Sequence, residues 1–361
     1  MKIVTVTCLR SHNYGAVLQA YALQKTILSL GYDNQLLDYT IEAGAKAKKR
    51  NLKAMARNAL LFTTRFMNRE KYRRFCNAFK NFVDENLLLT REYLSIEDLR
   101  KNPPPCDCFL TGSDQVFALG NQLALPRFLD FGGSETIKVS YAASLGSYAM
   151  NDADLAYVKE RLSEFRKISL REKQGSEYLS ETLGFSCITH VDPIFLLPVE
   201  QWEMLAEKKP RVQGSYILVY PMIGNNNLQR VIDYVKQELG LPVVSLQNKF
   251  VKTVKADKYL YDVTVPEYLT LIKNASAVIT TSFHTTCFSI LFKRPFYSLV
   301  GPYKPERAKN ICSLLGLEDR VIAHDAREIP LPTTNFEKVD LIIEREKARS
   351  IEYLASLREL Q

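Results

Sequence analysis

Strand-length apolar segments alternate with helix-length amphipathic segments along most of this chain. Residues 3–7 and 35–39 are apolar enough for buried strands, and residues 16–30 between them carry apolar side chains at helical spacing. Gly31 follows that predicted helix, where the backbone often turns left-handed. Further strands are predicted at 107–111, 138–142 and 167–170. This alternation predicts a parallel sheet with right-handed crossovers.

The same pattern repeats in the second half of the chain. Strands are predicted at 216–220, 243–246, 277–280 and 296–300, and residues 191–198 read as a crossing between domains. A chain of 361 residues is longer than one ordinary core requires. We therefore predict an α/β fold of two facing Rossmann-like domains, 1–190 and 191–335, with a C-terminal helix, 336–361, returning to the first. Ligands of such sheets bind beyond the carboxyl ends of the strands, here in the cleft between the domains.

A basic helical insertion is predicted within the first domain at about 41–89. Between Lys46 and Arg74, eleven Lys or Arg residues stand against one acid, Glu70, a surplus of ten positive charges in a chain of formal net charge +8. Residues 46–74 are predicted to contact an anionic membrane surface, or a lipid-diphosphate acceptor held there. A solvated helical face would also explain the charges. Nucleic acid is not expected as a partner, because its binders more often carry positive charge along a whole face or domain.

Several classes of protein and site are not expected from the sequence. No segment reaches the roughly 20 apolar residues that span a bilayer, and the N-terminal apolar run is too short for a signal peptide. The seven cysteines are scattered, which argues against zinc and a disulfide framework. The first loop is not a G-x-G-x-x-G motif, and there is no P-loop or H-E-x-x-H, so no cofactor and no metal are expected. The expected location is the cytoplasm, including the inner face of the membrane, with reduced thiols.

The most informative segment is 278–292. A strand ends there, a polar turn follows, and a helix is predicted to begin at about Thr285. His284 would lie beside the amide groups of a helix start, which bind phosphate or carboxylate, and its imidazole could act as a general acid or base. Ser282, Thr285 and Thr286 would add hydroxyl donors. The alternative is structural: Ser282 or Thr285 caps the helix, and His284 is a structural residue.

Polar residues also follow the predicted strands of the first half. Arg171 suits bidentate binding of a carboxylate or phosphate, or a surface pair with Glu172 or Glu177. Asp114 could act as a base toward a hydroxyl group, or cap the next helix. The first loop leads into a helix and could either line a site or supply an ordinary N-cap at Asn13.

These motifs, in this order, resemble those of the polysaccharide pyruvyl transferase family. The matching segments are NYGAVLQAYALQ from Asn13, TGSDQV from Thr111, SYAAS from Ser140, SLRE from Ser169, Asp192-Pro193, and SFH from Ser282 through Pro295. The resemblance implies a fold like the GT-B glycosyltransferases, with phosphoenolpyruvate as donor. The implied acceptor is a sugar of a cell-surface polysaccharide, such as a capsule or exopolysaccharide, or of its lipid-linked precursor. The product would be a pyruvate ketal bridging two hydroxyl groups of that sugar.

The resemblance also implies where donor and acceptor bind. His284 and Arg171 match the histidine and the arginine that family members use around the donor. Asp114 is expected to take a proton from the acceptor. The other residues expected at the donor are Ser282, Thr285, Thr286, Lys304 and Arg307. Those expected at the acceptor or the cleft are Asn13, Tyr14, Gly15, Gln19, Ser113 and Ser144.

Two residues depart from the family pattern. Well-studied members carry Arg two residues before the histidine, where this chain has Ser282, and the glycine that often follows the histidine is Thr285 here. The loss of one guanidinium weakens donor recognition, or moves it to the helix start and another base, Lys293, Lys304 or Arg307. Two other functions stay open: a GT-B-type glycosyltransferase that uses a nucleotide sugar, and a non-catalytic protein of polysaccharide assembly.

Overall fold

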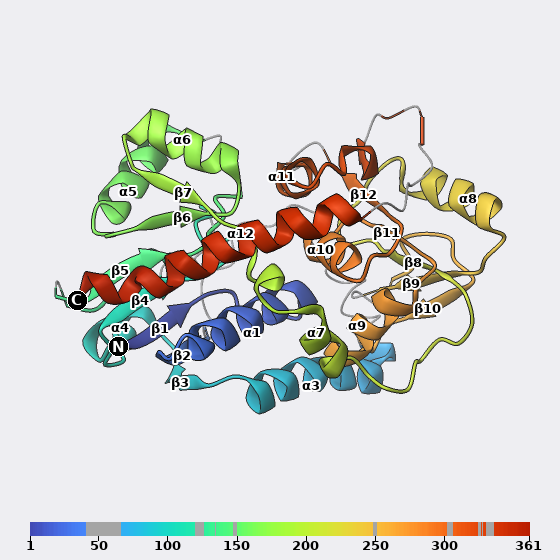
Figure 1. Ribbon diagram of the computed structural model, residues 1–361. Coiled ribbons are helices and arrows are strands. Elements are labelled where there is room, and N and C mark those ends of the chain that lie inside the picture. Colours follow the sequence, from blue (N-terminus) through green and yellow to red (C-terminus); the bar gives the residue numbers. More distant parts are fainter. Residues whose placement is uncertain are drawn as a thin grey trace. The chain divides into compact units, whose positions relative to one another are not determined.

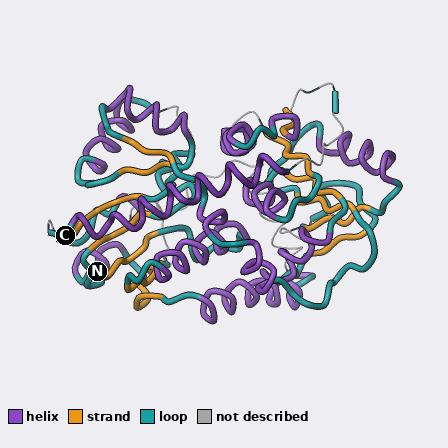
Figure 2. Tube along the Cα trace, viewed as in Figure 1, coloured by secondary structure: helices purple, strands orange, loops and turns teal. Residues whose placement is uncertain are grey.

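The computed structural model of the chain describes residues 1–40, 66–119, 126–133, 135–146, 150–247, 251–301, 306–323, 326, 328–329 and 336–361. These residues form two compact units in which helices and strands alternate (Figure 1, Figure 2). Unit 1 comprises the described residues within Met1–Ala43, Val83–Leu197 and Asp340–Gln361, and unit 2 those within Gly44–Phe82 and Pro198–Val339. The chain passes from unit 1 to unit 2 after Leu197, inside the segment predicted to cross between domains.

The described strands of unit 1 form a five-stranded parallel sheet in the order β3-β2-β1-β4-β5. These strands are β1 (Lys2–Val6), β2 (Asp33–Tyr39), β3 (Leu89–Tyr93), β4 (Cys108–Thr111) and β5 (Ile137–Ser140). A second parallel pair, β6 (Ile168–Leu170) and β7 (Cys187–Thr189), continues the sheet beyond β5 through isolated bridges. The helices between the strands are α1 (Tyr14–Ser29), α4 (Ile96–Lys101), α5 (Asp152–Leu162) and α6 (Lys173–Leu183), and the 3-10 helix η2 (Pro193–Leu196) follows β7.

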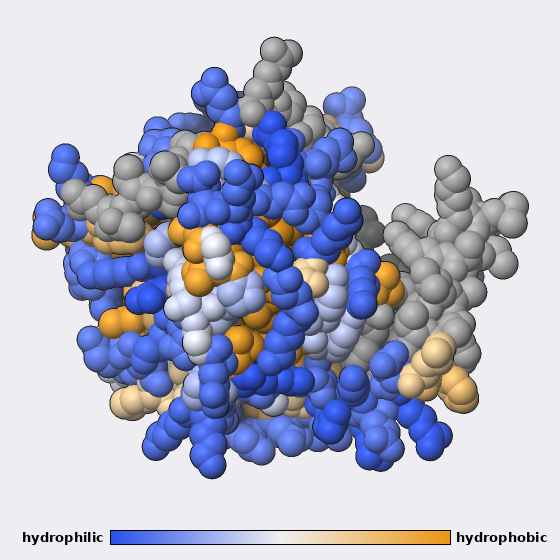
Figure 3. Space-filling view, turned by 90° about the vertical axis from the view of Figure 1, so that its right-hand side faces the viewer, coloured by the Kyte–Doolittle hydropathy of each residue, from blue (hydrophilic) through white to orange (hydrophobic). Residues whose placement is uncertain are grey.

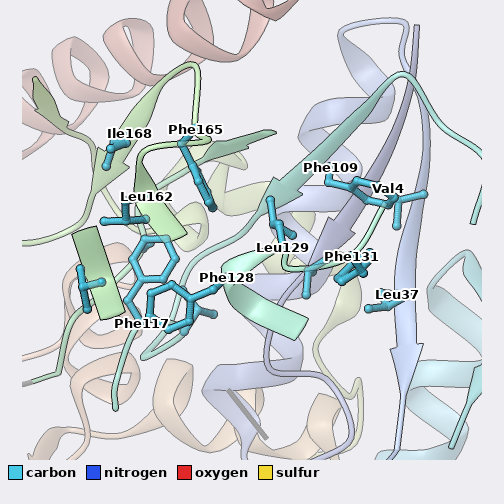
Figure 4. Packing of buried hydrophobic residues seen from close by; sticks show 14 of the residues in the cluster. Val4, Leu37, Phe109, Phe117, Phe128, Leu129, Phe131, Leu162, Phe165 and Ile168 are labelled. Carbon is cyan, nitrogen blue, oxygen red and sulfur yellow. The ribbon is translucent and has the colours of Figure 1, made fainter. Parts of the chain in front are cut away.

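Aromatic side chains fill the core beside this sheet (Figure 4). Phe109 on β4 meets Phe131 edge to face, with ring centroids 4.8 Å apart. Phe117 packs on Phe128 at 5.0 Å and meets Phe165 at 6.0 Å. Phe117 and Phe128 come from the loops after β4, so the core also anchors the segments that leave the carboxyl end of the sheet.

The C-terminal segment belongs to unit 1 from Asp340 onward. It consists of α12 (Glu337–Ala355) and the 3-10 helix η4 (Ser356–Leu360). Tyr353 donates its hydroxyl hydrogen to the backbone oxygen of Ser140 at 2.7 Å, and Tyr32 donates to that of Leu354 at 2.9 Å. Leu354 and Leu357 are fully buried. Residues 340–361 are thus part of the fold of the first unit.

The described strands of unit 2 form a six-stranded parallel sheet in the order β10-β9-β8-β11-β12-β13. They are β8 (Ile217–Tyr220), β9 (Val243–Leu246), β10 (Lys258–Leu260), β11 (Ala277–Thr280), β12 (Phe296–Val300) and β13 (Val321–Ala323). The helices are α7 (Val199–Leu205), α8 (Leu228–Leu239), α9 (Val265–Asn274), α10 (Phe283–Leu291) and α11 (Glu306–Leu314), the 3-10 helix η3 (Glu318–Arg320), and α3 (Arg69–Asn86), which belongs to unit 2 through Phe82.

In both units the chain builds the sheet outward from its first strand and then returns to the other side of that strand. The reversal places neighbouring loops at a topological switch point, between β1 and β4 in unit 1 and between β8 and β11 in unit 2. The predicted α/β fold with two Rossmann-like sheets is confirmed. The carboxyl ends of the strands at a switch point are where such sheets bind ligands.

Four short strands were not predicted: β3, β7, β10 and β13. Three of them, β3, β10 and β13, are edge strands of the two large sheets. β3, β7 and β10 each carry exposed residues and so lack the apolar run of a central strand, whereas β13 is apolar but only three residues long. The described part of the predicted insertion is helical where α3 lies, and its residues 41–65 are outside the described residues. The insertion was predicted within the first domain, whereas α3 is grouped with unit 2 through Phe82, where Arg74 pairs with Asp262. Its predicted end at about 89 falls at the start of β3 instead.

The face of the molecule in Figure 3 is mainly hydrophilic, and its hydrophobic patches are small and interrupted. None of the described helices combines the length with the apolar composition that a bilayer-spanning segment requires.

Candidate functional site

His284 lies at the switch point of unit 2. The loops after β8 and β11 are joined there by hydrogen bonds. The Thr281 hydroxyl accepts from the amide of Ile223 at 3.0 Å and donates to the carbonyl of the same residue at 3.2 Å. The Thr280 hydroxyl donates to the Tyr220 carbonyl at 3.0 Å. This edge of the sheet is therefore held in a defined shape at the point where α10 begins.

The helix that carries His284 begins two residues earlier than predicted. Ser282 is its N-cap, and the Ser282 hydroxyl accepts from the amide of Thr285 at 3.4 Å. His284 is the second residue of the helix, with only 4% of its surface exposed, and its ring meets Phe283 edge to face at 5.1 Å. The Arg307 guanidinium lies 5.8 Å from the Phe283 ring. The structure therefore brings His284, Ser282 and Arg307 around one residue, Phe283.

Thr285 and Thr286, also predicted at the donor, use their hydroxyl groups within the unit. The Thr285 hydroxyl is 2.8 Å from that of Tyr268 on α9. The Thr286 hydroxyl is 2.8 Å from that of Ser298 on β12 and donates to the Ser282 carbonyl. Both threonines are fully buried. Their hydroxyl groups thus fix α10 against its neighbours, and so fix the position of His284.

Of the bases considered as substitutes for the missing arginine, Lys293 is excluded by its position. It follows the C-terminal end of α10, a helix of nine residues, and so lies more than ~10 Å from the helix start. There it lines a cavity of about 540 Å³ with Lys273, Arg294 and Glu203. This cavity lies at the C-terminal ends of α9 and α10, away from His284. Lys304 lies outside the described residues. Among the described residues, Arg307 lies near the helix start, beside Phe283.

In unit 1 the predicted residues also gather at the switch point. Asp114 follows β4 in the left-handed backbone region, with φ at 74°, a conformation that aspartate tolerates better than most residues. Its carbonyl accepts from the amide of Ser144 at 2.9 Å, which joins the ends of β4 and β5. Gly112 allows the close approach of α1 here, because a Cβ would lie 2.9 Å from the Leu23 side chain. The backbone thus sets the direction of the Asp114 side chain.

A chain of buried polar groups runs under this edge. Gln19 donates to the Thr7 hydroxyl at 2.9 Å, and Thr7 donates to the Ser113 carbonyl at 2.9 Å. The Ser113 hydroxyl donates to Asp192 at 3.2 Å. Gln19, Ser113 and Ser144 have no exposed surface. In the structure, these three residues hold the loops after β1, β4 and β5 in place.

Arg171 lies at the end of this chain and is bound by two carboxylates. Its Nη1 donates to Asp192 at 2.7 Å, and its Nε donates to Glu172 at 3.1 Å. The side chains of all three residues are at most 3% exposed. Burial lowers the pKa of Arg171, but the Glu172 and Asp192 carboxylates outweigh burial and raise it, so the guanidinium stays charged. Arg171 does pair with Glu172, as one sequence interpretation had it, but in the interior rather than on the surface.

The thiol of Cys8 lies beside Asp114. Burial, together with the negative charge of Asp114, raises the pKa of Cys8 to about 12, so the thiol is protonated at neutral pH. A protonated thiol is a weak hydrogen-bond donor. Cys8 can therefore donate a weak hydrogen bond to the Asp114 side chain.

The first loop supplies the N-cap of α1. The Asn13 side chain accepts from the amides of Gly15 and Ala16, at 3.0 and 3.4 Å. Tyr14 is 1% exposed and Gly15 is buried as well. The structural interpretation of Asn13 is therefore confirmed; Asn13 is half-buried, and Ser11 and His12 of the same loop are exposed.

Sequence reasoning missed three residues of the unit 1 cluster: Asp192, Glu172 as a buried partner, and Cys8. A signal was present for Asp192, because the Asp192-Pro193 pair follows a strand and opens η2, where the carboxylate also accepts from the Ile194 amide at 3.1 Å. Among the described residues, no group of three or more His, Cys, Asp or Glu side chains is placed to hold a metal ion.

His190, next to this cluster, is buried in its neutral form. Its Nδ1 lies 2.8 Å from the Ser169 hydroxyl, and its ring packs on Tyr141 and Tyr353. Burial, reinforced by the positive charge of Arg349, lowers the pKa of His190 from 6.5 to about 4. Arg349 is itself paired with Glu346 at 2.6 Å.

The low pKa of His190 predicts a loss of stability in acid. Between pH 6.5 and about 4 the unfolded chain binds a proton that the folded chain does not, so stability falls as the pH falls. We expect His190 to account for a loss of about 2 kcal/mol between pH 7 and pH 5. The measurement is urea unfolding at both pH values for the wild type and a His190→Phe variant. An equal acid loss in both proteins would contradict the assignment.

Solved structures resemble this chain in fold. The UDP-GlcNAc 2-epimerase of Methanocaldococcus jannaschii, in complex with UDP-GlcNAc and UDP, has a TM-score of 0.55 and 13% identity over 100% of this chain and 99% of that one. A further structure of that epimerase has a TM-score of 0.52 and 12% identity over 95% and 92%. The MnaA–UDP structure of S. aureus has a TM-score of 0.52 and 10% identity over 98% and 90%. The predicted GT-B-like fold is confirmed by these likenesses, which concern the fold alone.

The search of the curated proteins found no match to this chain. The model of the polysaccharide pyruvyl transferase family matches residues 13–301. That range includes every segment on which the resemblance in the sequence rests, from Asn13 to Pro295.

Proposed function

The chain belongs to the polysaccharide pyruvyl transferase family, and on that premise we propose that it transfers the pyruvyl group of phosphoenolpyruvate to a sugar. Family membership implies a transferase with a glycan acceptor. The proposed acceptor is a sugar of a cell-surface polysaccharide or of its lipid-linked precursor, and the proposed product is a pyruvate ketal. A lipid-linked acceptor would bring the protein to the inner face of a membrane, where residues 46–74 would make a peripheral contact.

The observation that carries the proposal is the position of His284. It is a buried imidazole at the start of a helix, at the switch point of a parallel sheet, with the Arg307 guanidinium near the same phenylalanine. A helix start and a guanidinium both favour a negative charge, and an imidazole can transfer a proton near neutral pH. Phosphoenolpyruvate requires both, since it is an anion whose methylene carbon must be protonated.

The proposed chemistry balances without water or a metal. His284 protonates C3 of phosphoenolpyruvate, which leaves C2 electrophilic, and a sugar hydroxyl attacks C2. Asp114 takes the proton of that hydroxyl. The bond between C2 and the bridging oxygen breaks, phosphate departs, and a second hydroxyl of the sugar closes the ketal and releases its proton. One C–H bond at C3 and two C–O bonds to the sugar form, while the π bond between C2 and C3, the C–O bond to phosphate and two O–H bonds break; the second hydroxyl proton goes to the departing phosphate.

The proposal that Arg171 binds the donor is the part of the assignment that the surrounding charges oppose most. A donor anion at Arg171 would also meet Glu172 and Asp192, whose negative charges oppose it. If the donor does contact this guanidinium, the Arg171→Ala variant should bind phosphoenolpyruvate at least ~10-fold more weakly, as expected for the loss of charge-assisted hydrogen bonds. Calorimetric titration measures this directly. Unchanged affinity in the variant would make Arg171 a structural residue and leave the donor to His284, the helix start and Arg307.

The same titration tests the runner-up, a glycosyltransferase that uses a nucleotide sugar. Two structures of similar fold hold UDP, which is a reason to include uridine and cytidine nucleotides as competitors. Nucleotide binding without phosphoenolpyruvate binding would favour the runner-up and contradict pyruvyl transfer. Failure to bind any of these small anions would favour the non-catalytic alternative. The argument for that alternative is Ser282 in place of the family arginine.

A further inference from the structure

Several exposed cationic side chains lie close together in the first turns of α3. Arg69, Lys71 and Arg73 are exposed and stand within its first five residues, with Glu70 as the acid among them. Arg69 and Arg73 are also four residues apart, hence neighbours on the helix surface that repel each other. The placement of these charges therefore requires an explanation outside the helix.

The described residues offer these charges no compensation. Arg74 pairs with Asp262 at 3.0 Å, and Asp262 also pairs with Arg211. In contrast, no ion pair within the described part of the chain involves Arg69, Lys71 or Arg73. Three cations thus remain available to an anionic partner.

Two large apolar side chains stand beside these cations. Phe66 and Met67, just before α3, are 67% and 77% exposed. The apolar face of α3 itself is buried: Phe75, Phe79 and Phe82 are 2%, 3% and 4% exposed. Phe66 and Met67 are therefore left outside the core, next to a cluster of positive charge.

We propose that Phe66, Met67, Arg69, Lys71 and Arg73 form a docking surface for an anionic phospholipid membrane. Arg and Lys contact the phosphate-bearing headgroups, and the two apolar side chains enter the boundary between headgroups and acyl chains. The combination fits a lipid surface better than nucleic acid, because the described cations form one small cluster instead of a basic face. The inference rests on the proposed function for its membrane contact and is independent of the donor and of the chemistry.

Vesicle binding by the full chain tests the surface. The probes are vesicles of phosphatidylcholine alone and vesicles that also contain phosphatidylserine, with sedimentation as the measurement and no donor or acceptor present. Each basic residue near an anionic surface contributes roughly five-fold to partitioning. The variant Arg69→Gln/Lys71→Gln/Arg73→Gln should therefore bind anionic vesicles at least ~10-fold more weakly than the wild type. The variant Phe66→Ser/Met67→Ser should also bind more weakly, and its loss should resist added salt.

A matched control removes three positive charges elsewhere in unit 2. Lys208, Lys209 and Lys258 are exposed, and Lys208→Gln/Lys209→Gln/Lys258→Gln should bind vesicles like the wild type. Equal losses of vesicle binding in both triple variants would contradict a local docking surface. Failure of the wild type to bind anionic vesicles would contradict it as well. A wild type that binds RNA but not vesicles would also overturn the proposal. Phosphoenolpyruvate titration of the same samples distinguishes failure of the membrane proposal from failure of the proposed pyruvyl transfer, because donor binding is not expected to depend on the residues of the docking surface.

Discussion

Replacement of His284 by Ala is expected to lower the rate of pyruvyl transfer at least ~10²-fold while the chain remains folded. The rate should fall because proton transfer to C3 would lose its acid. The fold should persist because Thr285 and Thr286, which the variant keeps, make the hydrogen bonds that attach α10 to Tyr268 and Ser298. The measurement is phosphate release from phosphoenolpyruvate in the presence of the acceptor glycan, with circular dichroism as the check on folding.

A His284→Asn variant separates proton transfer from packing. Asparagine keeps a polar side chain of moderate size but cannot act as a general acid near neutral pH. If both variants are equally slow and both bind phosphoenolpyruvate, the imidazole acts in the chemical step. Turnover near the wild-type rate in either variant would contradict the role of His284, whatever the family membership.

Replacement of Asp192 by Ala is expected to destabilise the protein by about 3 kcal/mol. The Arg171 guanidinium is 3% exposed, so it would remain charged in the interior with one carboxylate, Glu172, in place of two. The change would also remove the acceptor of the Ser113 hydroxyl and of the Ile194 amide. Urea unfolding measures the loss as a shift in the midpoint.

The matched control for Asp192 is an ion pair at the surface of the same unit. Lys173 and Glu177 are 75% and 51% exposed and lie four residues apart on α6. Glu177→Ala should change stability by less than ~0.5 kcal/mol, because an exposed pair gains little. An Asp192→Asn variant should lie between the two, since it keeps the acceptor for Ile194 and removes the charge. Similar stability of Asp192→Ala and Glu177→Ala would contradict the importance of the buried pair.

The central strands and the two sheets could be predicted because their signal is local. Ile217–Tyr220 and Ala277–Thr280 are buried on both faces of a parallel sheet, and such strands appear in a sequence as short apolar runs. The edge strands could not be predicted in this way. Lys258–Leu260 has one exposed and one half-buried residue, and its pairing with Val244–Leu246 depends on a partner that is distant in the sequence.

The sequence predicted where the residues of the candidate site lie, but not which side chains they bind. The strand ends indicated His284, Arg171 and Asp114, because residues after parallel strands collect at one edge. The sequence gives no measure of which charges meet, so it could not reveal that Asp192 binds Arg171 from 21 residues away. The start of α10 was misplaced for a related reason: both Ser282 and Thr285 are common N-caps, and the hydroxyl of Thr285 instead bonds to Tyr268.

The C-terminal residues of unit 1 determine the order in which the two units can complete their folding during synthesis. Unit 2 contains the unbroken stretch Pro198–Val339, whereas unit 1 needs Asp340–Gln361 to supply Tyr353, Leu354 and Leu357. During synthesis, domains fold from the N-terminus as units. Here unit 1 emerges first but cannot complete its core until residues 340–361 have been translated, so its sheet stays partly folded while Pro198–Val339 is made.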